Sequence, residues 1–362
     1  MAYRTHNCNE LTFDNLNEKV TLAGWVDTIR DHGGVAFIDL RDEHGVTQVV
    51  VNDDTLIYHL KKESVISVEG VVVKRDPETV NKKLATGELE VKVDKLTVLG
   101  ACTENLPFEV SESKETREDV RLTYRFLDLR NKAVHDNIIF RSNVISFLRQ
   151  KMTSLGFTEI TTPILTCSSP EGARDYIIPS RKHEGKFYAL PQAPQQFKQL
   201  LMVSGFDKYF QIAPCFRDED ARADRSPGEF YQLDFEMAFA TQEDVFAVAE
   251  DVLYDTFTKF GGGKKVSPAP FVRIPYEEAM IKYGTDKPDL RNPLEIVDLT
   301  DFFADVEFKA FQGRPVRGIN VPGCAKQSKG WFEKMLKFAL EIGMKGLGSV
   351  SYTHLTLPTK LE

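Results

Sequence analysis

The stretch from Phe210 to Phe239 constrains the fold of this chain more strongly than any other part of the sequence. Its second half alternates strictly between apolar and polar residues, which is the period of a β-strand with one apolar and one polar face. Asp220 to Gly228 is a charged segment that contains the turn signal Ser-Pro-Gly at residues 226–228. We therefore predict two antiparallel strands joined by a long charged loop. The apolar face of the second strand is predicted to carry Leu233, Phe235, Met237 and Phe239.

The polar face of these two strands is the first candidate functional surface. Arg217 and Glu219 lie two residues apart and share a face if the first strand extends that far. Gln232, Asp234 and Glu236 supply an amide and two carboxylates on the second strand. A solvated sheet face alone would explain this pattern, because antiparallel sheets often have one side in water. A solvated face does not require a particular order of residues. This stretch nevertheless contains an ordered set of polar residues: FRDED, Arg, EF, Gln, Asp and Glu.

Composition sets the broad class of the protein. At 362 residues the chain is long enough for two or three domains, and 42% hydrophobic with 28% charged residues is ordinary for a globular protein. No run of about 18 apolar residues is present, and the opening MAYRTHNCNE lacks a signal peptide's apolar stretch. The five cysteines are odd in number and lack CxxC spacing, which argues against a disulfide framework or a zinc site and favours a reducing, cytoplasmic location. The net charge of −8 does not favour a nucleic-acid binder, although an acidic protein can carry a local basic groove.

The N-terminal part of the sequence is rich in β-strand signals. Five runs, at residues 20–27, 35–41, 46–51, 65–74 and 89–99, are broken by Gly, Asp and Pro, and a helix is predicted near residues 54–62. This pattern fits an OB-fold barrel, which binds single-stranded nucleic acid by stacking bases on aromatic rings and holding phosphates with basic side chains. Taken singly, each candidate contact is explained more simply as a core aromatic or a solvated rim charge. The candidates are Arg30, Phe37, Gln48, Arg75 and Glu90.

A linker and an amphipathic helix follow the predicted barrel. Residues 101–120 are polar and acidic and lack periodicity. The helix is indicated by apolar residues at spacings of three and four, and Gly156 is its predicted end. A short strand is predicted at residues 157–162, before Pro163. The apolar residues of the helix are Val144, Ile145, Leu148, Met152 and Leu155.

A small, polar segment at residues 166–180 is predicted to be a mobile loop. After it, APQQFKQLLMVSGF predicts a helix that ends at Gly205 and places Gln195 and Lys198 one turn apart. A later helix is predicted to open at Thr241 with a capping box. The predicted buried residues are Phe197, Leu200 and Leu201 in the first helix and Val245, Val248, Ala249, Val252 and Leu253 in the second.

The ordered polar residues of the opening stretch resemble motif 2 of the class II aminoacyl-tRNA synthetases, in detail the bacterial aspartyl type. The segments GWV…RDHGGVAFIDLRDEHGVTQVV and ATGELEV are similar to the anticodon-binding domain of that family. The helix and strand before Pro163 are similar to motif 1, which forms the dimer interface, and YGTDKPDLRNP is similar to the start of an insertion domain. The resemblance implies an α+β multidomain homodimer with an N-terminal OB-fold, an antiparallel catalytic sheet with helices, and the beginning of an α+β insertion.

The resemblance also implies domain boundaries. Residues 1–105 would form the anticodon-binding OB-fold, 106–135 a linker or hinge, 136–292 the catalytic domain, 293–348 part of the insertion, and 349–362 a tail foreign to the family. The similarity stops near Gly348, and motif 3 is not found in this sequence. We therefore expect the 362-residue chain to make little aspartyl-adenylate, although its parent enzyme would make it.

The chemistry that the resemblance implies is attachment of L-aspartate to tRNA-Asp through aspartyl-adenylate. ATP would be a substrate, and Mg²⁺ an expected cofactor whose ligands lie outside this chain, so no metal ligand is expected here. Arg217 would be the catalytic cation that bridges the substrate carboxylate and the α-phosphate, because its planar fork of donors suits both. The implied aspartate contacts are Glu171, Gln195, Lys198, Arg217 and Asp234, and the implied ATP contacts are Arg217, Asp218, Glu219 and Gln232.

The resemblance further implies how tRNA is bound. Phe37 would stack on an anticodon base, while Arg30, Gln48 and Glu90 would read base edges beside Arg75. Thr28 departs from the family, which often has a basic run there. Arg222 and Arg225 would meet the acceptor end of the tRNA.

Two other interpretations remain open. One is a non-catalytic tRNA-binding fragment, favoured by the missing motif 3. The other is an asparaginyl or relaxed aspartyl/asparaginyl enzyme that also charges tRNA-Asn, because that difference rests on few anticodon contacts.

Overall fold

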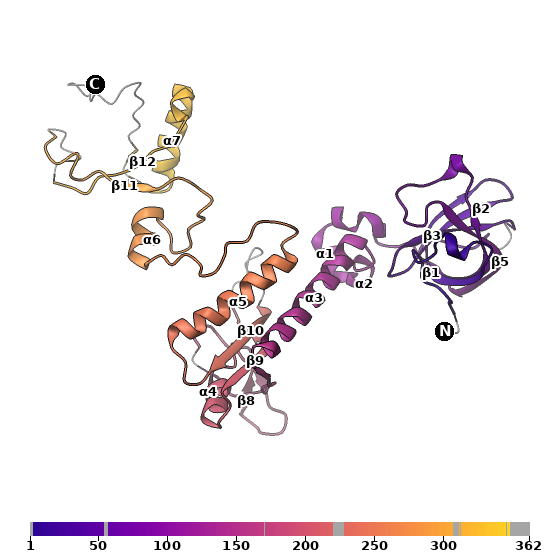
Figure 1. Cartoon of the computed structure of the whole chain (residues 1–362), viewed down its shortest axis with the longest axis horizontal. Coiled ribbons are helices and arrows are strands. Elements are labelled where there is room, and N and C mark those ends of the chain that lie inside the picture. Colours follow the sequence, from indigo (N-terminus) through magenta and orange to yellow (C-terminus); the bar gives the residue numbers. More distant parts are fainter. Residues whose placement is uncertain are drawn as a thin grey trace. The chain divides into compact units, whose positions relative to one another are not determined.

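The structure is a computed structural model, and it describes residues 3–53, 57–169, 171–219, 228–306, 311, 313–344 and 346–347. The chain divides into two compact units, residues 1–142 and residues 143–362 (Figure 1). Within the described residues, no helix combines the length and the apolar character needed to cross a membrane.

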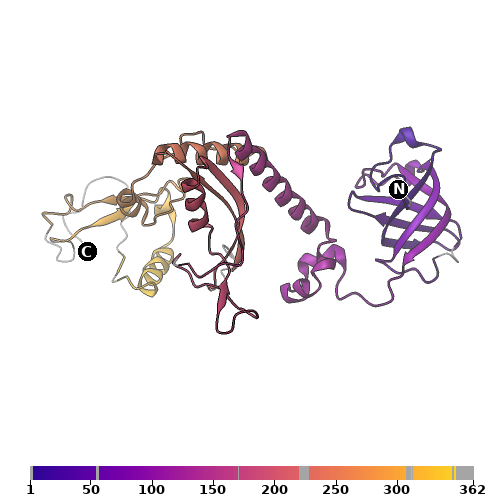
Figure 2. The same cartoon turned by 90° about the horizontal axis from the view of Figure 1, so that it is seen from below.

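The first unit is built around a closed five-stranded barrel with the strand order β1-β2-β3-β5-β4 (Figures 1 and 2). Alternate residues point inward, so that Leu22, Ile38 and Ile66 are fully buried. Neighbouring strands are antiparallel except β3 and β5, which are parallel. The predicted OB-type barrel is confirmed, with small shifts of the strand ends. The elements are η1 (Phe13–Asn15), β1 (Lys19–Asp31), β2 (Ala36–Arg41), β3 (Val46–Val51), β4 (Val65–Lys74), η3 (Pro77–Thr79) and β5 (Leu89–Gly100).

Two glycines permit the close approach of strands on which the barrel depends. A Cβ atom on Gly24 would lie 2.3 Å from the carbonyl oxygen of Arg41, and one on Gly70 would lie 2.2 Å from that of Lys92. Real Cβ atoms do not approach backbone oxygens so closely. The glycine of the GWV segment is therefore required by packing between β1 and β2.

The prediction of a helix near residues 54–62 is wrong for residues 57–62, the part of this range that the structure describes. Residues 57–63 form turns, in which the Leu60 amide donates to the Ile57 carbonyl at 2.8 Å. Glu63 has a φ of +63°, which does not continue a right-handed helix. Residues 54–56 lie outside the described residues.

The segment after the barrel is more ordered than its composition predicted. The Asp128 carboxylate is fully buried and accepts hydrogen bonds from Arg121 and Arg125. The side-chain amide of Asn131 donates to the Val110 carbonyl at 3.0 Å. These bonds hold helices that are too short to show amphipathic periodicity, which is why the sequence indicated a linker. The elements are η4 (Val110–Glu115), α1 (Glu118–Thr123) and α2 (Arg125–Asp128).

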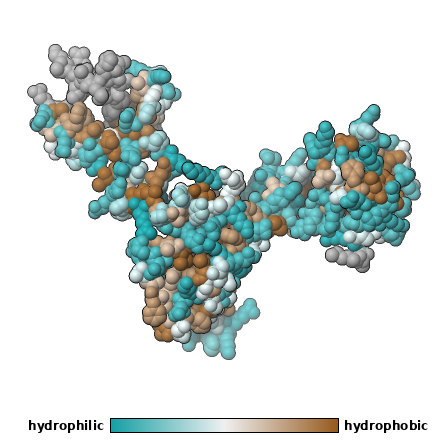
Figure 3. Space-filling model, in the orientation of Figure 1, coloured by the Kyte–Doolittle hydropathy of each residue, from teal (hydrophilic) through white to brown (hydrophobic). Residues whose placement is uncertain are grey.

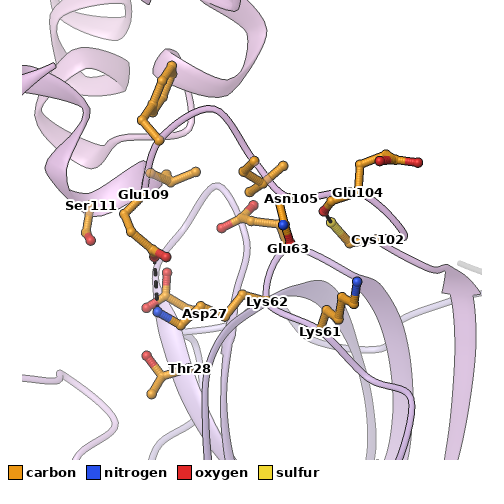
Figure 4. Close-up of a pocket in the computed structure, with 13 residues that line it drawn as sticks. Asp27, Thr28, Lys61, Lys62, Glu63, Cys102, Glu104, Asn105, Glu109 and Ser111 are labelled. Atoms are coloured by element: carbon orange, nitrogen blue, oxygen red, sulfur yellow. Dashed lines mark hydrogen bonds and ion pairs between the residues drawn. The ribbon is translucent and has the colours of Figure 1, made fainter.

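A cleft of about 470 Å³ lies between barrel residues and this segment (Figure 4). Most of its charged side chains are engaged in bonds within the first unit. Lys62 Nζ lies 3.0 Å from the Glu109 carboxylate, as the dashed line in Figure 4 shows. Glu63 forms ion pairs with both Arg41 and Arg130. We interpret the cleft as the seam between the barrel and the following helices rather than as a ligand site.

The second unit is organised around a three-stranded sheet with the order β10-β9-β6. β9 and β10 are antiparallel, while β6 runs parallel to β9. β7 and β8 form a separate antiparallel pair, as do β11 and β12. The elements are α3 (Lys132–Ser154), which begins in the first unit, β6 (Thr158–Glu159), β7 (Ile177–Pro179), β8 (Phe187–Ala189), α4 (Gln195–Val203), β9 (Lys208–Phe216), β10 (Glu229–Met237), α5 (Gln242–Phe260), α6 (Tyr276–Tyr283), β11 (Ile296–Asp298), β12 (Arg317–Ile319), η5 (Cys324–Lys326) and α7 (Lys329–Glu341).

The apolar face of β9 and β10 is covered by α3 and α5, which lie along the sheet in both views (Figures 1 and 2). The buried residues of this core are Met152, Phe157, Phe210 and Val252, and the partly buried Leu233, Phe235 and Met237 pack against them. The predicted alternation of the second strand is therefore confirmed over these three residues. Burying this face leaves the opposite, polar face of β9 and β10 for function.

Several predicted ends and caps are confirmed. Gly156 and Gly205 follow α3 and α4 with φ angles of +83° and +91°, which favour glycine and end the helices. Thr241 forms the predicted capping box with Asp244, since each side chain accepts a bond from the backbone of the other.

Other expectations on the second unit are wrong. Phe239 lies beyond β10 with a φ of +52° and is fully exposed, because the strand ends at Met237. β6 spans two residues instead of the six predicted. Three expected core residues are exposed, because the apolar faces of their helices are wider than the surface they cover: Leu200 (60%), Val245 (37%) and Leu253 (44%).

Candidate functional site

The polar face of β9 and β10 gathers the candidate side chains by strand register. Asp234 lies opposite Gln211, and Glu236 lies opposite Tyr209. Directly opposed residues of antiparallel strands point to the same side. The face therefore carries Tyr209, Gln211 and Cys215 of β9 together with Phe230, Gln232, Asp234 and Glu236 of β10.

Lys198 of α4 reaches onto this face and pairs with two carboxylates. Its Nζ lies 3.0 Å from Oδ1 of Asp234 and 3.2 Å from Oε2 of Glu236. The Lys198 side chain is 12% exposed and that of Asp234 only 3%. Burial on its own would lower the pKa of Lys198, but its bonds to Asp234 and Glu236 outweigh this effect and raise the pKa. Lys198 is therefore a fixed, fully charged ammonium at neutral pH.

Two buried oxygen atoms on the same face lack hydrogen-bond partners among the described residues. They are the hydroxyl of Tyr209 and Oδ2 of Asp234. Burial, with the charge of Asp234 adding to it, raises the pKa of Tyr209, so the phenol stays protonated. A buried acceptor without a partner costs about 1–3 kcal/mol. Asp234 and Tyr209 nevertheless interact, and burial raises the pKa of Asp234 while its bonds to Lys198 and Tyr209 oppose that shift.

Arg217 lies immediately after β9 and extends the ladder by one bond, from its amide to the Gly228 carbonyl at 2.8 Å. Its guanidinium lies 5.0 Å from the centre of the Phe230 ring, so the ring supports the cation. Arg217 is two residues beyond Cys215, on the side of the sheet that carries the polar face. Arg217 is half-buried.

Cys215 was not identified from the sequence as a site residue. Its thiol contacts Oε1 of Gln232 at 3.6 Å, and Nε2 of Gln232 lies 3.4 Å from Oδ1 of Asp234. Burial raises the pKa of Cys215 to about 11. The thiol is therefore neutral and orients Gln232 instead of acting as a nucleophile.

The strand does not extend to Glu219, contrary to the prediction. β9 ends at Phe216, and the Glu219 amide donates to the carbonyl of Arg217 at 3.0 Å, which turns the chain. Asp218 is held instead by Arg174, whose carbonyl accepts from the Asp218 amide at 2.9 Å. Asp218 and Glu219 are both exposed.

The remaining residues predicted to bind substrate lie on neighbouring segments. Gln195 is the first residue of α4, one turn before Lys198 as predicted. Glu171 is exposed and accepts a 3.2 Å bond from the hydroxyl of Ser169. Arg222 and Arg225 lie outside the described residues.

On the barrel, four of the five predicted RNA contacts form one bonded network. The Arg30 guanidinium donates to both carboxylate oxygens of Asp39, at 2.7 and 2.8 Å, and to Oε1 of Gln48 at 3.1 Å. Gln48 in turn donates to the Glu90 carboxylate at 2.8 Å. Arg75 lies 3.8 Å from the same carboxylate. Asp39, which completes the network, was not identified from the sequence.

Phe37 lies directly across from Arg30 in the β1–β2 register, and is thus beside the network. The rings of His32 and Phe37 form a T-shaped pair, with centroids 5.6 Å apart at an interplanar angle of 80°. Phe37 points outward, since its neighbours Ala36 and Ile38 are the ones buried in the core. The ring is thus available for stacking.

Burial shapes the charges of this network. It raises the pKa of Glu90 and lowers that of Arg75, while the bond to Asp39 raises the pKa of Arg30. Nη2 of Arg75 is buried and has no partner among the described residues. Gln48 and Arg75 are buried, at 6% and 3% exposure, whereas Arg30 is exposed. The network therefore lies largely beneath the surface, and Arg30 carries its exposed end beside the aromatic ring.

Comparison with known protein families assigns both units. Residues 117–340 match the family described as tRNA synthetases class II (D, K and N), and residues 20–99 match the OB-fold nucleic acid binding domain. Among curated relatives, the "Aspartate--tRNA(Asp/Asn) ligase" of Zymomonas mobilis is 58% identical over 359 residues, and that of Rickettsia bellii is 56% identical over 362. Each match covers 97% of this chain, and the chain spans about 60% of the length of these relatives.

Solved structures share the fold. A putative aspartyl-tRNA synthetase from Leishmania major superposes with a TM-score of 0.64 at 26% identity, covering 73% of this chain and 54% of that one. Asparaginyl-tRNA synthetase from Pyrococcus horikoshii superposes with a TM-score of 0.65 at 22% identity, covering 94% and 87%. Because the family match spans residues 117–340, more than half of the chain, the chain belongs to the class II tRNA synthetases of the D, K and N group.

Proposed function

We propose that the protein to which this chain belongs attaches aspartate to tRNA through an aspartyl-adenylate. The observation that carries this proposal is the Lys198 ammonium, fixed between Asp234 and Glu236 on the same sheet face as Arg217. The names of its relatives as aspartate–tRNA ligases support the choice of amino acid.

The amino-acid pocket is proposed to lie around Lys198. The side-chain carboxylate of aspartate would join Asp234 and Glu236 around the Lys198 ammonium, which has three N–H donors and uses two of them on these carboxylates. Oδ2 of Asp234 would accept a hydrogen bond from the substrate ammonium. Gln195 and Glu171 are proposed as further contacts of the bound aspartate. Neutral asparagine would lose the charge pairing with Lys198, which is the proposed basis of specificity.

Arg217 is proposed as the catalytic residue. Its guanidinium would bridge the substrate carboxylate and the α-phosphate of ATP, where negative charge develops as the bond forms. Aspartate attacks the α-phosphorus and pyrophosphate leaves, so no protein nucleophile is needed. Gln232 would contact the nucleotide, and Asp218 and Glu219 would contact ATP from the turn after β9. Catalysis would then rest on positioning and charge stabilisation.

Mg²⁺ would accompany ATP, since magnesium is bound mostly through substrate phosphates with few protein carboxylates. The described residues include no group of three or more His, Cys, Asp or Glu side chains placed to hold a metal. They therefore do not fit a resident metal centre, and no step is assigned to the ion here.

The barrel is proposed to bind the anticodon. Phe37 would stack on a base, and the network of Arg30, Gln48, Glu90 and Arg75 would read base edges, because its donors and acceptors are held at fixed positions beside the ring. Arg222 and Arg225 are proposed for the acceptor end of the tRNA.

A homodimer through α3 is also proposed. Ile138 and Ile139 of α3 are 45% and 41% exposed, and Leu165 after β6 is 56% exposed. Figure 3 shows hydrophobic surface on the part of the molecule that carries the sheet. Light scattering during gel filtration should report a dimer, and Ile139→Asp should shift it to monomer; a monomeric parent chain would contradict the proposal.

A second candidate is a ligase that charges both tRNA-Asp and tRNA-Asn. It is favoured by the relatives, whose names include both tRNAs. Aminoacylation of the two transcripts with radiolabelled aspartate distinguishes the candidates, since a discriminating enzyme charges tRNA-Asp alone.

The deciding experiment for the main proposal is amino-acid-dependent ATP–pyrophosphate exchange. The complete protein should support exchange with aspartate and should discriminate strongly against asparagine and glutamate. Exchange that does not depend on aspartate would overturn the proposal. That residues 1–362 alone make little adenylate stays a prediction, which the same assay on this chain tests.

A further inference from the structure

Gln192, between β8 and α4, is a buried polar residue that the proposed reaction does not use. Its side chain is 2% exposed, yet all of its polar atoms are bonded. Oε1 accepts from the Ala173 amide at 3.0 Å, and Nε2 donates to the Ala173 carbonyl at 2.9 Å. Nε2 also contacts the Asp175 carboxylate and, at 3.4 Å, the Ser169 carbonyl. One amide thus holds three residues of a single loop.

The loop of residues 168–175, of which residue 170 lies outside the described residues, is closed by a further contact. The Ser168 hydroxyl donates to the second oxygen of Asp175. Hydrogen bonds from Gln192 and Ser168 lower the pKa of Asp175, so the carboxylate is ionised and accepts both. The composition of this segment predicted a mobile loop, but these bonds pin its two ends together around Gln192.

The pinned loop is joined directly to the segment that carries Arg217. The Asp218 amide donates to the Arg174 carbonyl at 2.9 Å, and Nε of Arg174 donates to the Asp218 carbonyl at 2.9 Å. Arg174 lies between Ala173 and Asp175, the two residues that Gln192 holds most closely. The position of Asp218, next to Arg217, therefore depends on the conformation that Gln192 imposes.

We propose that Gln192 is a positioning residue that docks the 168–175 loop onto the segment after β9 and so sets the distance between Glu171 and Arg217. The roles of Glu171 and Arg217 rest on the proposed function, but the coupling itself does not. A buried side-chain amide whose partners made no contact with the segment after β9 would stabilise the fold, but it would not couple the 168–175 loop to that segment. Gln192 differs because each of its partners lies in one loop and that loop bonds to Asp218.

Gln211 provides a matched control. It is also buried, at 4% exposure, and its side chain bonds to a single neighbouring segment through the Thr162 amide and hydroxyl. Methionine has a similar volume to glutamine and forms none of these bonds. Each variant, Gln192→Met and Gln211→Met, should therefore destabilise the fold by removing the hydrogen bonds of one buried amide. Only Gln192→Met removes bonds to the 168–175 loop.

Amide hydrogen exchange of the 362-residue chain, without aspartate or ATP, tests the coupling. In Gln192→Met, we expect the amides of Ala173 and Asp218 to exchange about tenfold faster or more, with β9–β10 ladder amides changed far less, because opening becomes local. Gln211→Met should leave Ala173 and Asp218 protected. Unchanged exchange at Asp218 in folded Gln192→Met would overturn the proposal, as would equal acceleration of all amides.

A milder variant covers the case in which Gln192→Met does not fold. Asp175→Asn keeps the shape of the side chain but removes the charge that Gln192 and Ser168 bond to. It should accelerate exchange at Ala173 and Asp218 several-fold, and unchanged protection at both amides would contradict the coupling. Because no substrate is present, failure of the pyrophosphate-exchange assay would count against the proposed function and leave this result standing.

Discussion

The two candidate surfaces of this protein differ in the buried group that each leaves incompletely paired among the described residues: a guanidinium nitrogen of Arg75 on the barrel, and a carboxylate oxygen of Asp234 on the sheet. On the barrel, Arg30, Asp39 and Gln48 bond to one another, and the charges largely cancel before any ligand binds. On the β9–β10 face, the buried Asp234 keeps one oxygen without a partner among the described residues. A paired surface suits recognition by shape and stacking, because it is already rigid and costs little to desolvate. An unsatisfied acceptor suits a small charged ligand, whose binding removes an existing penalty.

The largest expected effect concerns Arg217 on the sheet. Arg217→Met in the complete protein should reduce aspartate-dependent pyrophosphate exchange by about 100–1,000-fold, the usual cost of one preorganised contact to a developing charge. Arg273→Met is the matched control, because its guanidinium also lies over a ring, 4.6 Å from the centre of Phe246. The control should retain its rate. If both variants lose activity equally, the effect is structural and the sheet is not the site.

The barrel should respond more weakly and without loss of adenylate formation. Phe37→Ala should weaken binding of the tRNA-Asp anticodon stem-loop by about 1–3 kcal/mol, the range for loss of one stacked base. Titration by fluorescence anisotropy measures it. Tyr58→Ala, which removes an exposed ring elsewhere on the barrel, should bind as the parent does. Equal affinity of all three proteins would remove Phe37 as the stacking platform.

The smallest expected effect concerns an ion-paired carboxylate, Asp128, that is assigned no role in ligand binding. Asp128 is paired with arginines as the barrel residues are, and although burial opposes it, the bonds from Arg121 lower its pKa. Because the folded pKa lies below the unfolded value, its stabilisation is present above about pH 4 and is lost as the pH falls further. Urea unfolding from pH 7 to pH 2 should show this loss, and Asp128→Asn should lack that part of the pH dependence. A variant with the parent's full acid sensitivity would show that other groups are responsible.

Much of the fold around the β9–β10 face could be predicted from the sequence, because it depends on local periodicity. The strict alternation around Asp234 predicted which face of β10 is polar, and helical spacing placed Gln195 and Lys198 one turn apart. Glycine and capping signals correctly predicted where α3, α4 and α5 begin or end. Each of these features is set by a few consecutive residues.

What was missed depends on contacts between distant segments. Asp39 pairs with Arg30 only because β1 has a bulge between Val26 and Thr28, which changes the register against β2. Gln192 sits in an irregular segment, where no periodic pattern shows that an amide is buried. Phe239 was placed on a strand that ends earlier, since alternation continues in the sequence beyond the last ladder bond. Glu219 was placed on the preceding strand by its two-residue spacing from Arg217, but that strand ends at Phe216.

The central claim is that the β9–β10 face binds aspartate through Lys198, and its most direct test is Lys198→Met in the complete protein. Lys151→Met is the control, because Lys151 is similarly buried and also pairs with two carboxylates, Asp251 and Asp255. Pyrophosphate exchange at saturating ATP should show that Lys198→Met loses about 2–5 kcal/mol of aspartate recognition, the usual cost of breaking a desolvated charge pair. The control should keep the aspartate KM of the parent. An unchanged KM and kcat for aspartate in Lys198→Met would contradict the claim.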